Sequence, residues 1–186
     1  KMLIYPADRI AEIQDSAKLG ITAEVKDVDF VAIMERMRTS IHKYSGEMRE
    51  AALATKDFDY YEGEAHFVED YVLEVNGQQI KGDRIIIASG SRPFVPPVKG
   101  LDSVDYLINE SALELTERPE SLIIVGGGYI GVEFAHFFAA MGTKVTILEM
   151  GSRLVANEEP EISDLLKKKL AERMDILTVV QAEEVR

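Results

Sequence analysis

Three glycines in the second half of the chain are spaced as a dinucleotide site requires. Gly126, Gly128 and Gly131 match G-x-G-x-x-G, a pattern that also occurs in glycine-rich turns without a ligand. Here an apolar segment runs into Gly126 and a helical pattern begins at the loop. Gly126 would allow a tight turn, Gly128 a close backbone approach to a pyrophosphate, and Gly131 close packing of helix on strand. The context therefore predicts a bound dinucleotide.

Two carboxylates extend this site. Glu149 follows the next apolar segment at about the distance of 20 residues at which an acidic side chain meets the ribose hydroxyls of NAD. It favours NAD over NADP, while Arg153 nearby could accommodate a 2′-phosphate. Glu133 stands in an apolar stretch just after Gly131. It either stabilises the positive end of the helix or faces the nicotinamide.

These residues must be positioned by strands and helices that alternate along the last part of the chain. The pattern predicts strands over residues 121–125, 144–149 and 176–180, and helices over 129–141 and 161–174. This order indicates an α/β fold with a parallel sheet and crossover helices. The pattern is interrupted at residues 117–120, which contain Pro119. This interruption separates the α/β region from the preceding part of the chain.

A helical pair comes first in the chain. One helix is predicted over residues 6–18, and a second begins after Asp27 or Asp29 as its N-cap. The second helix carries an apolar stripe at helical spacing, formed by Phe30, Met34, Met37, Ile41, Tyr44 and Met48. We interpret this stripe as core packing rather than as a cofactor box or a coiled-coil seam.

An antiparallel β-meander is predicted between the helical pair and the α/β region. Short alternating segments fill residues 57–88, and Asn76-Gly77 between two of them predicts a tight hairpin. The apolar run Ile85-Ile86-Ile87 predicts a buried strand over residues 84–88. A Gly/Pro-rich passage over residues 90–97 then leaves the sheet.

Composition limits the classes of function. The 186 residues are 46% hydrophobic and carry a net charge of −12, a balance that repels the phosphate backbone of nucleic acids. The absence of cysteine excludes a disulfide, a thiolate metal site and a cysteine nucleophile within these residues. The three histidines match no metal-ligand spacing. No signal peptide or membrane-spanning run is visible, so we expect a soluble cytoplasmic protein with no metal, nucleic-acid or membrane partner.

Several motifs in order resemble the flavoprotein pyridine nucleotide-disulfide oxidoreductases, typified by dihydrolipoamide dehydrogenase. VGGGYIGVE at residues 125–133 looks like the NAD motif of that family, and IASGSRP at 87–93 looks like its second flavin motif, ATGSRP. GEAHF at 63–67 is similar to the family's segment that contacts the flavin adenine. The first three residues, KML, are similar to those that follow the redox disulfide in the family. The resemblance covers essentially the whole chain.

The resemblance implies hydride transfer between NAD and FAD, followed by electron transfer to a redox disulfide. Lys1 and Glu133 would be the catalytic residues, paired near the reactive flavin nitrogen, and Tyr129 would cover the empty nicotinamide site. The residues expected to bind NAD are Gly126, Gly128, Tyr129, Ile130, Gly131, Glu133, Glu149 and Met150. The residues expected to bind FAD are Lys1, Ala65, Ala88, Ser89 and Gly90.

The resemblance also implies a division into two incomplete domains. Residues 1–117 would be the C-terminal portion of an FAD-binding domain, with helices within 6–54 and the meander over 57–98. Residues 118–186 would be the N-terminal portion of a Rossmann-like NAD-binding domain. The family's first flavin glycine motif, its redox cysteines, its later Gly-Asp motif and its C-terminal interface domain have no counterpart here. We expect an internal fragment, inactive and weakly flavin-binding by itself, of a homodimer that assembles through the missing domain.

These residues are compatible with several types of parent enzyme. Mercuric and mycothione reductases are the nearest within the family; residues 92–97 with Val104-Asp105-Tyr106 look like mycothione reductase, whose phosphorylated cofactor disagrees with Glu149. A flavin-dependent NADH oxidase without paired cysteines and a nucleotide-binding module without chemistry are alternatives of other classes. Cysteines ahead of Lys1 distinguish the disulfide reductase from the oxidase. The substrate, a small-molecule or lipoyl disulfide, is not specified by these residues.

Overall fold

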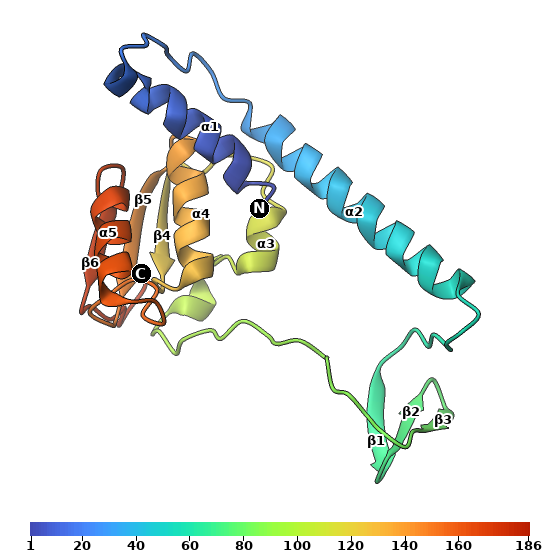
Figure 1. The fold of residues 1–186 in the computed structure, drawn as a ribbon. Coiled ribbons are helices and arrows are strands. Elements are labelled where there is room, and N and C mark those ends of the chain that lie inside the picture. The colour runs from blue at the N-terminus through green and yellow to red at the C-terminus, as the bar shows by residue number, and fades with distance from the viewer. The chain divides into compact units, whose positions relative to one another are not determined.

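The computed structural model describes residues 1–186 and divides into two compact units (Figure 1). The first unit comprises Lys1–Ser40 and Val95–Arg186, and the second comprises Ile41–Phe94. None of the helices combines the length and the apolar character that crossing a membrane requires.

A parallel sheet forms the centre of the first unit. Its strands are β4 (Ser121–Val125), β5 (Lys144–Glu149) and β6 (Asp175–Thr178), in the order β4-β5-β6. Helices α4 (Tyr129–Ala140) and α5 (Pro160–Leu170) connect them (Figure 1). The predicted alternation of strand and helix is confirmed, and so is the parallel pairing.

The hydrophobic core of this unit lies where α4 packs between the sheet and the N-terminal helix. Phe137 and Phe138 on α4 are 0% and 1% exposed, and Ile147 on β5 is 0% exposed. Helix α1 (Ile4–Asp15), followed by the 3₁₀ turn η1 (Ser16–Leu19), packs against α4 (Figure 1). The short elements η2 (Leu101–Ser103) and α3 (Asn109–Leu113) lead into β4.

The long helix α2 (Phe30–Ala54) begins as predicted but buries only part of its stripe. The Asp29 carboxylate accepts the backbone N–H of Ala32, which makes Asp29 the N-terminal cap. The stripe residues in the first unit, Phe30, Met34 and Met37, are buried, whereas Ile41, Tyr44 and Met48 are exposed. The prediction of core packing is therefore confirmed for the first half of the stripe and wrong for the second.

The second unit contains the predicted meander. Strands β1 (Ala65–Glu69), β2 (Val72–Val75) and β3 (Gln78–Lys81) form an antiparallel sheet in the order β1-β2-β3. Asn76 and Gly77 join β2 to β3 with φ angles of 52° and 78°, the combination that a type I′ hairpin turn requires. The hairpin prediction is confirmed.

The buried strand predicted over residues 84–88 is absent. These residues form no regular secondary structure, and the side chains of Ile86 and Ile87 are 91% and 73% exposed. An apolar run becomes a buried strand only when neighbouring strands pair with it and other elements cover both faces. No strand pairs with this segment here, so its composition alone does not give the predicted structure.

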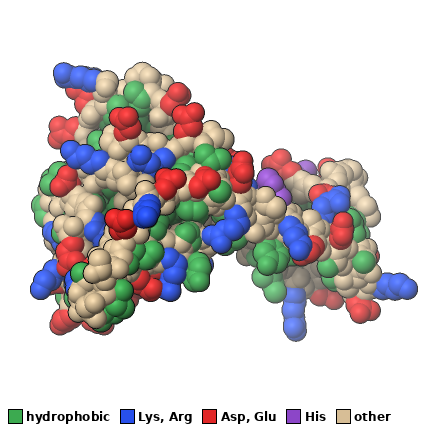
Figure 2. All heavy atoms as spheres, turned by 90° about the horizontal axis from the view of Figure 1, so that it is seen from above, with side chains coloured by type: hydrophobic (Ala, Val, Ile, Leu, Met, Phe, Trp, Pro, Cys, Tyr) green, Lys and Arg blue, Asp and Glu red, His purple; other side chains and the backbone are tan.

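Charged side chains of both signs are mixed over the face of the molecule that Figure 2 shows, with hydrophobic side chains between them. Some of the exposed hydrophobic residues belong to the parallel sheet. Ile123 and Val125 on β4 and Leu177 on β6 are 65%, 54% and 49% exposed. The helices therefore cover the sheet incompletely.

Candidate dinucleotide site and the adjoining helix pair

The glycine loop joins β4 to α4 and has the shape that the motif predicts. Gly126 has a φ of +110°, and its N–H donates to the Leu148 carbonyl at 2.8 Å, so the chain turns sharply beside β5. A Cβ atom at Gly131 would collide with the Gly126 carbonyl oxygen, whereas one at Gly128 would meet no atom within 4 Å. Gly131 thus allows α4 to pack closely on the loop, and Gly128 leaves the outer side of the loop open.

The start of α4 offers donors to an anion. Gly128 is its N-cap, and no side chain caps the helix there. The first N–H groups of an α-helix have no intrahelical acceptors, and the helix dipole adds partial positive charge at the same place. Tyr129 and Ile130, the first helical residues, are 71% and 45% exposed. The arrangement fits a pyrophosphate on the open side of Gly128.

Glu149 lies at the end of β5 and is held against the glycine loop. Its carboxylate accepts the N–H of Gly127 at 2.6 Å and the N–H of Gly151 at 2.5 Å. Its neighbour Met150 is 71% exposed. The structure therefore brings the predicted ribose ligand next to the predicted pyrophosphate loop.

A loop after β5, which was not predicted from the sequence, closes over the glycines. Leu154 is fully buried against Gly127, and the N–H of Val155 donates to the Gly127 carbonyl at 2.8 Å. Val155 has a φ of +42°, an uncommon conformation for a β-branched residue. Arg153 in the same loop has its Nη1 atom buried without a hydrogen-bond partner. No sequence motif marks Leu154 or Val155, since both act through contact with a distant loop.

The two predicted catalytic residues are in contact. Lys1 Nζ donates to Glu133 Oε1 at 2.6 Å, although the residues are 132 positions apart in the chain. The side chains are 88% and 43% exposed. The hydrogen bond to Glu133, reinforced by the negative charge of Glu133, raises the pKa of Lys1 above its ordinary value of 10.5. Lys1 therefore stays charged throughout the neutral range.

The predicted flavin residues are divided between the two units. Lys1 belongs to the first unit, whereas Ala65 on β1 and the residues 88–90 belong to the second. Ala88, Ser89 and Gly90 are exposed and have no regular secondary structure, and Gly90 has a φ of +73°. Their assignment to FAD stays a prediction.

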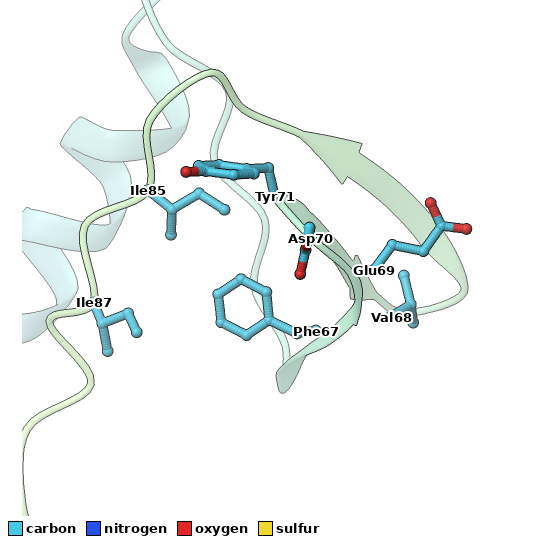
Figure 3. Close-up of a pocket in the computed structure, with 7 residues that line it drawn as sticks. All are labelled: Phe67, Val68, Glu69, Asp70, Tyr71, Ile85 and Ile87. Atoms are coloured by element: carbon cyan, nitrogen blue, oxygen red, sulfur yellow. The ribbon is translucent and has the colours of Figure 1, made fainter.

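A hollow lies beside the meander, close in sequence to the predicted flavin residues Ala65 and Ala88. It measures about 490 Å³ and is lined by Phe67, Val68, Glu69, Asp70, Tyr71, Ile85 and Ile87. In Figure 3 the side chains of Phe67, Tyr71, Ile85 and Ile87 surround a common space, whereas that of Glu69 points away. None of the predicted flavin or NAD residues lines this hollow.

A second polar contact joins α1 to α4 near the Lys1–Glu133 pair. His136 Nε2 lies 2.9 Å from Asp8 Oδ1 in a hydrogen bond, with side chains 17% and 49% exposed. His136 is therefore mostly buried and contacts a carboxylate of the neighbouring helix. The pairing with Asp8 was not predicted, because nothing local relates two residues 128 positions apart.

Comparison with known proteins places this chain in a family. Residues 7–186 match the family described as pyridine nucleotide-disulphide oxidoreductase. Mercuric reductase from Staphylococcus aureus is 33% identical over 92% of this chain and 32% of its own length. Dihydrolipoyl dehydrogenase from Geobacillus stearothermophilus is 35% identical over 93% of this chain and 37% of its own length.

A solved structure agrees with both sequence matches. The HOCl-induced flavoprotein disulfide reductase RclA from Escherichia coli superimposes with a TM-score of 0.76 at 30% identity, covering 96% of this chain and 40% of that one. The chain thus spans about a third of the length of the curated relatives given above. The resemblance drawn from the ordered motifs is confirmed, and the chain belongs to the pyridine nucleotide-disulphide oxidoreductase family.

Proposed function

We propose that this chain is part of an FAD-dependent NADH:disulfide oxidoreductase and supplies the first half of its Rossmann-like NAD-binding domain. The observation that carries the proposal is the contact of Lys1 with Glu133, on the same helix that begins at the glycine loop. When both cofactors are bound, NADH supplies a hydride to FAD, and the two electrons pass on to a disulfide. By the resemblance, residues 1–117 belong to the FAD-binding domain and residues 118–186 to the NAD-binding domain.

The glycine loop and Glu149 bind and select the nucleotide. Backbone N–H groups at the start of α4 hold the pyrophosphate on the open side of Gly128. An ionised carboxylate has about four acceptor sites, and the N–H groups of Gly127 and Gly151 occupy only two at Glu149. The remaining sites accept the ribose hydroxyls, and the negative charge repels the 2′-phosphate of NADP. Ile130 and Met150, both exposed at the loop, border the nucleotide.

Lys1, Glu133 and Tyr129 serve the reacting end of the nucleotide. Tyr129 is 71% exposed at the first position of α4. By the resemblance, its ring would cover the nicotinamide position and move aside when NADH enters. Glu133, one turn further along α4, holds the Lys1 ammonium in place, and by the resemblance this pair would lie near the reactive flavin nitrogen. By the resemblance, Ala65, Ala88, Ser89 and Gly90 contribute backbone contacts to FAD.

Anaerobic stopped-flow reduction of the flavin in the full-length protein tests the proposal. We expect NADH to reduce the flavin at least about tenfold more efficiently than NADPH, because Glu149 disfavours the extra phosphate. Glu149→Ala should remove most of this preference. Glu158→Ala, which removes an exposed carboxylate from the loop that precedes α5, is the matched control and should preserve it.

Two results would contradict the proposal. A protein that binds nucleotide but shows no flavin reduction with either cofactor is a binding module without this chemistry. Equal reduction by NADH and NADPH, unchanged in Glu149→Ala, would remove Glu149 from cofactor selection.

A mercuric reductase is the second candidate for the whole protein. It is favoured by the 33% identity to the Staphylococcus aureus mercuric reductase over 92% of this chain. The dihydrolipoyl dehydrogenase of Geobacillus stearothermophilus is similar at 35%, so the identities do not separate the two. Steady-state NADH oxidation with lipoamide or with Hg(II) as the electron acceptor distinguishes them. We expect turnover with the lipoyl disulfide, and turnover with Hg(II) alone would establish the second candidate.

A further inference from the structure

Helix α1 and the residue Lys1 just ahead of it carry a row of polar side chains. Three of them stand seven residues apart, about two helical turns, and each contacts a partner beyond α1. The contacts are Lys1 with Glu133, Asp8 with His136, and Asp15 with Arg173. Two of the three partners lie on α4, so these contacts join α1 and the residue three positions ahead of it to the helix that begins at the glycine loop.

The two contacts on α4 differ in how firmly they are held. Lys1 is 88% exposed, so its ion pair with Glu133 is screened by water and leaves the long side chains free to move. His136 is only 17% exposed and has a shorter side chain. Its hydrogen bond to Asp8 is less screened and allows fewer geometries. The geometry of the exposed pair therefore depends on what fixes α1 against α4.

Because α1 and α4 pack closely, a change in their relative orientation alters the geometry of the Lys1–Glu133 pair. Ala7 on α1 and Ala135 on α4 are both fully buried, and these small side chains let the helices approach closely. His136 follows Glu133 by three residues, so both project from the same side of α4. A rotation of α4 that moves His136 away from Asp8 would also carry Glu133 away from Lys1.

We propose that Asp8 and His136 are positioning residues for hydride transfer, whose hydrogen bond fixes the rotation of α4 against α1 and so holds Glu133 opposite Lys1. This inference rests on the proposed function. It also predicts which kinetic parameter changes. The N–H groups at the start of α4 lie near the helix axis and shift little when the helix rotates, whereas the Glu133 side chain swings with the helix surface. Nucleotide affinity should therefore be preserved while the rate of flavin reduction falls.

The experiment uses single and double variants of the full-length flavoprotein. The rate of flavin reduction is measured by anaerobic stopped flow across a range of NADH concentrations. We expect Asp8→Ala and His136→Ala each to lower the limiting rate about tenfold, because small misplacements of reacting groups are costly. The dissociation constant for NADH should stay within about twofold, and the double variant should be no slower than either single variant, because both remove one contact.

A reversed pair separates positioning from general stability. Asp8→His combined with His136→Asp rebuilds a hydrogen bond between the same helix positions and should restore the rate to within about threefold. The control is Lys169→Ala, which removes a contact with Glu172 beyond α1 and α4 and should leave the rate unchanged. Flavin content and melting temperature, measured on every variant, show whether it has folded.

Each remaining outcome overturns one of the two proposals. If the parent protein reduces its flavin and both single variants do so within about twofold of its rate, Asp8 and His136 do not position the pair. If the rate falls only together with flavin content and the reversed pair does not restore it, the contact is merely structural. If NADH does not reduce the flavin of the parent protein, the proposed function itself fails.

Discussion

At the scale of single residues, the three glycines of one motif have different physical tasks. A side chain at Gly131 would collide with the Gly126 carbonyl, which is backbone and cannot move without distorting the turn. A side chain at Gly128 would point into open space from an ordinary φ of −72°. Gly131 is therefore required by the fold, whereas the fold itself leaves room for a side chain at Gly128.

Alanine at each position should separate these tasks. Gly131→Ala should lower the free energy of unfolding by roughly 2 kcal/mol or more, a cost typical of an overpacked site. Gly128→Ala should change it by less than about 0.5 kcal/mol, because the new Cβ meets no atom. Urea unfolding of the chain measures both effects, and NADH titration of the full-length protein should show weakened binding for Gly128→Ala. Equal destabilisation by the two substitutions would contradict the separation.

The sequence could identify those residues of the site whose task depends on local spacing. Gly126, Gly131 and Glu149 were found in this way, and the structure places them together. The Lys1–Glu133 contact could be expected only through the resemblance to a known family. The contact of Asp8 with His136 could not be predicted, because the folded chain creates it between distant residues and a hydrogen bond of this kind leaves no local pattern.

At the scale of helices and strands, periodicity predicts which face of an element is apolar but not whether anything covers that face. The stripe of α2 has one spacing throughout, yet Met34 is fully buried and Met48 is 73% exposed. The run Ile85-Ile86-Ile87 has the composition of a buried strand and finds no partner strand. The parallel strands β4 and β5 have the predicted bounds because the sequence also encodes the helix that covers them.

The two methionines of α2 provide a matched test of this distinction. Met34→Ala should lower the free energy of unfolding by about 2–5 kcal/mol, because it removes buried surface and leaves a cavity in the core. Met48→Ala should change it by less than about 0.5 kcal/mol, since its side chain is already largely in water. Urea unfolding of the 186-residue chain compares the two variants. A loss at Met48 similar to that at Met34 would show that Met48 is covered in solution.

At the scale of the whole molecule, burial is concentrated in one of the two units. Of the buried hydrophobic residues, only Val75 belongs to the unit formed by Ile41–Phe94. Polar contacts of that unit include a bidentate ion pair between Arg49 and Glu62 and a hydrogen bond from Asn76 to the Glu62 carbonyl. The hydrogen bond from Arg49 lowers the pKa of Glu62, but both side chains are more than half exposed and water screens their interaction.

This distribution predicts that the two units lose their structure separately. A three-stranded sheet with one buried side chain has little hydrophobic stabilisation, so it should open locally without disturbing the parallel sheet. In hydrogen exchange followed by mass spectrometry, we expect amides of β1–β3 to exchange at least about a hundredfold faster than those of β5. Val75→Ala should accelerate exchange in the meander alone, whereas Ile147→Ala in the core should accelerate exchange of β4–β6 and α4. Equal protection of the two sheets would mean that the chain unfolds as one cooperative unit.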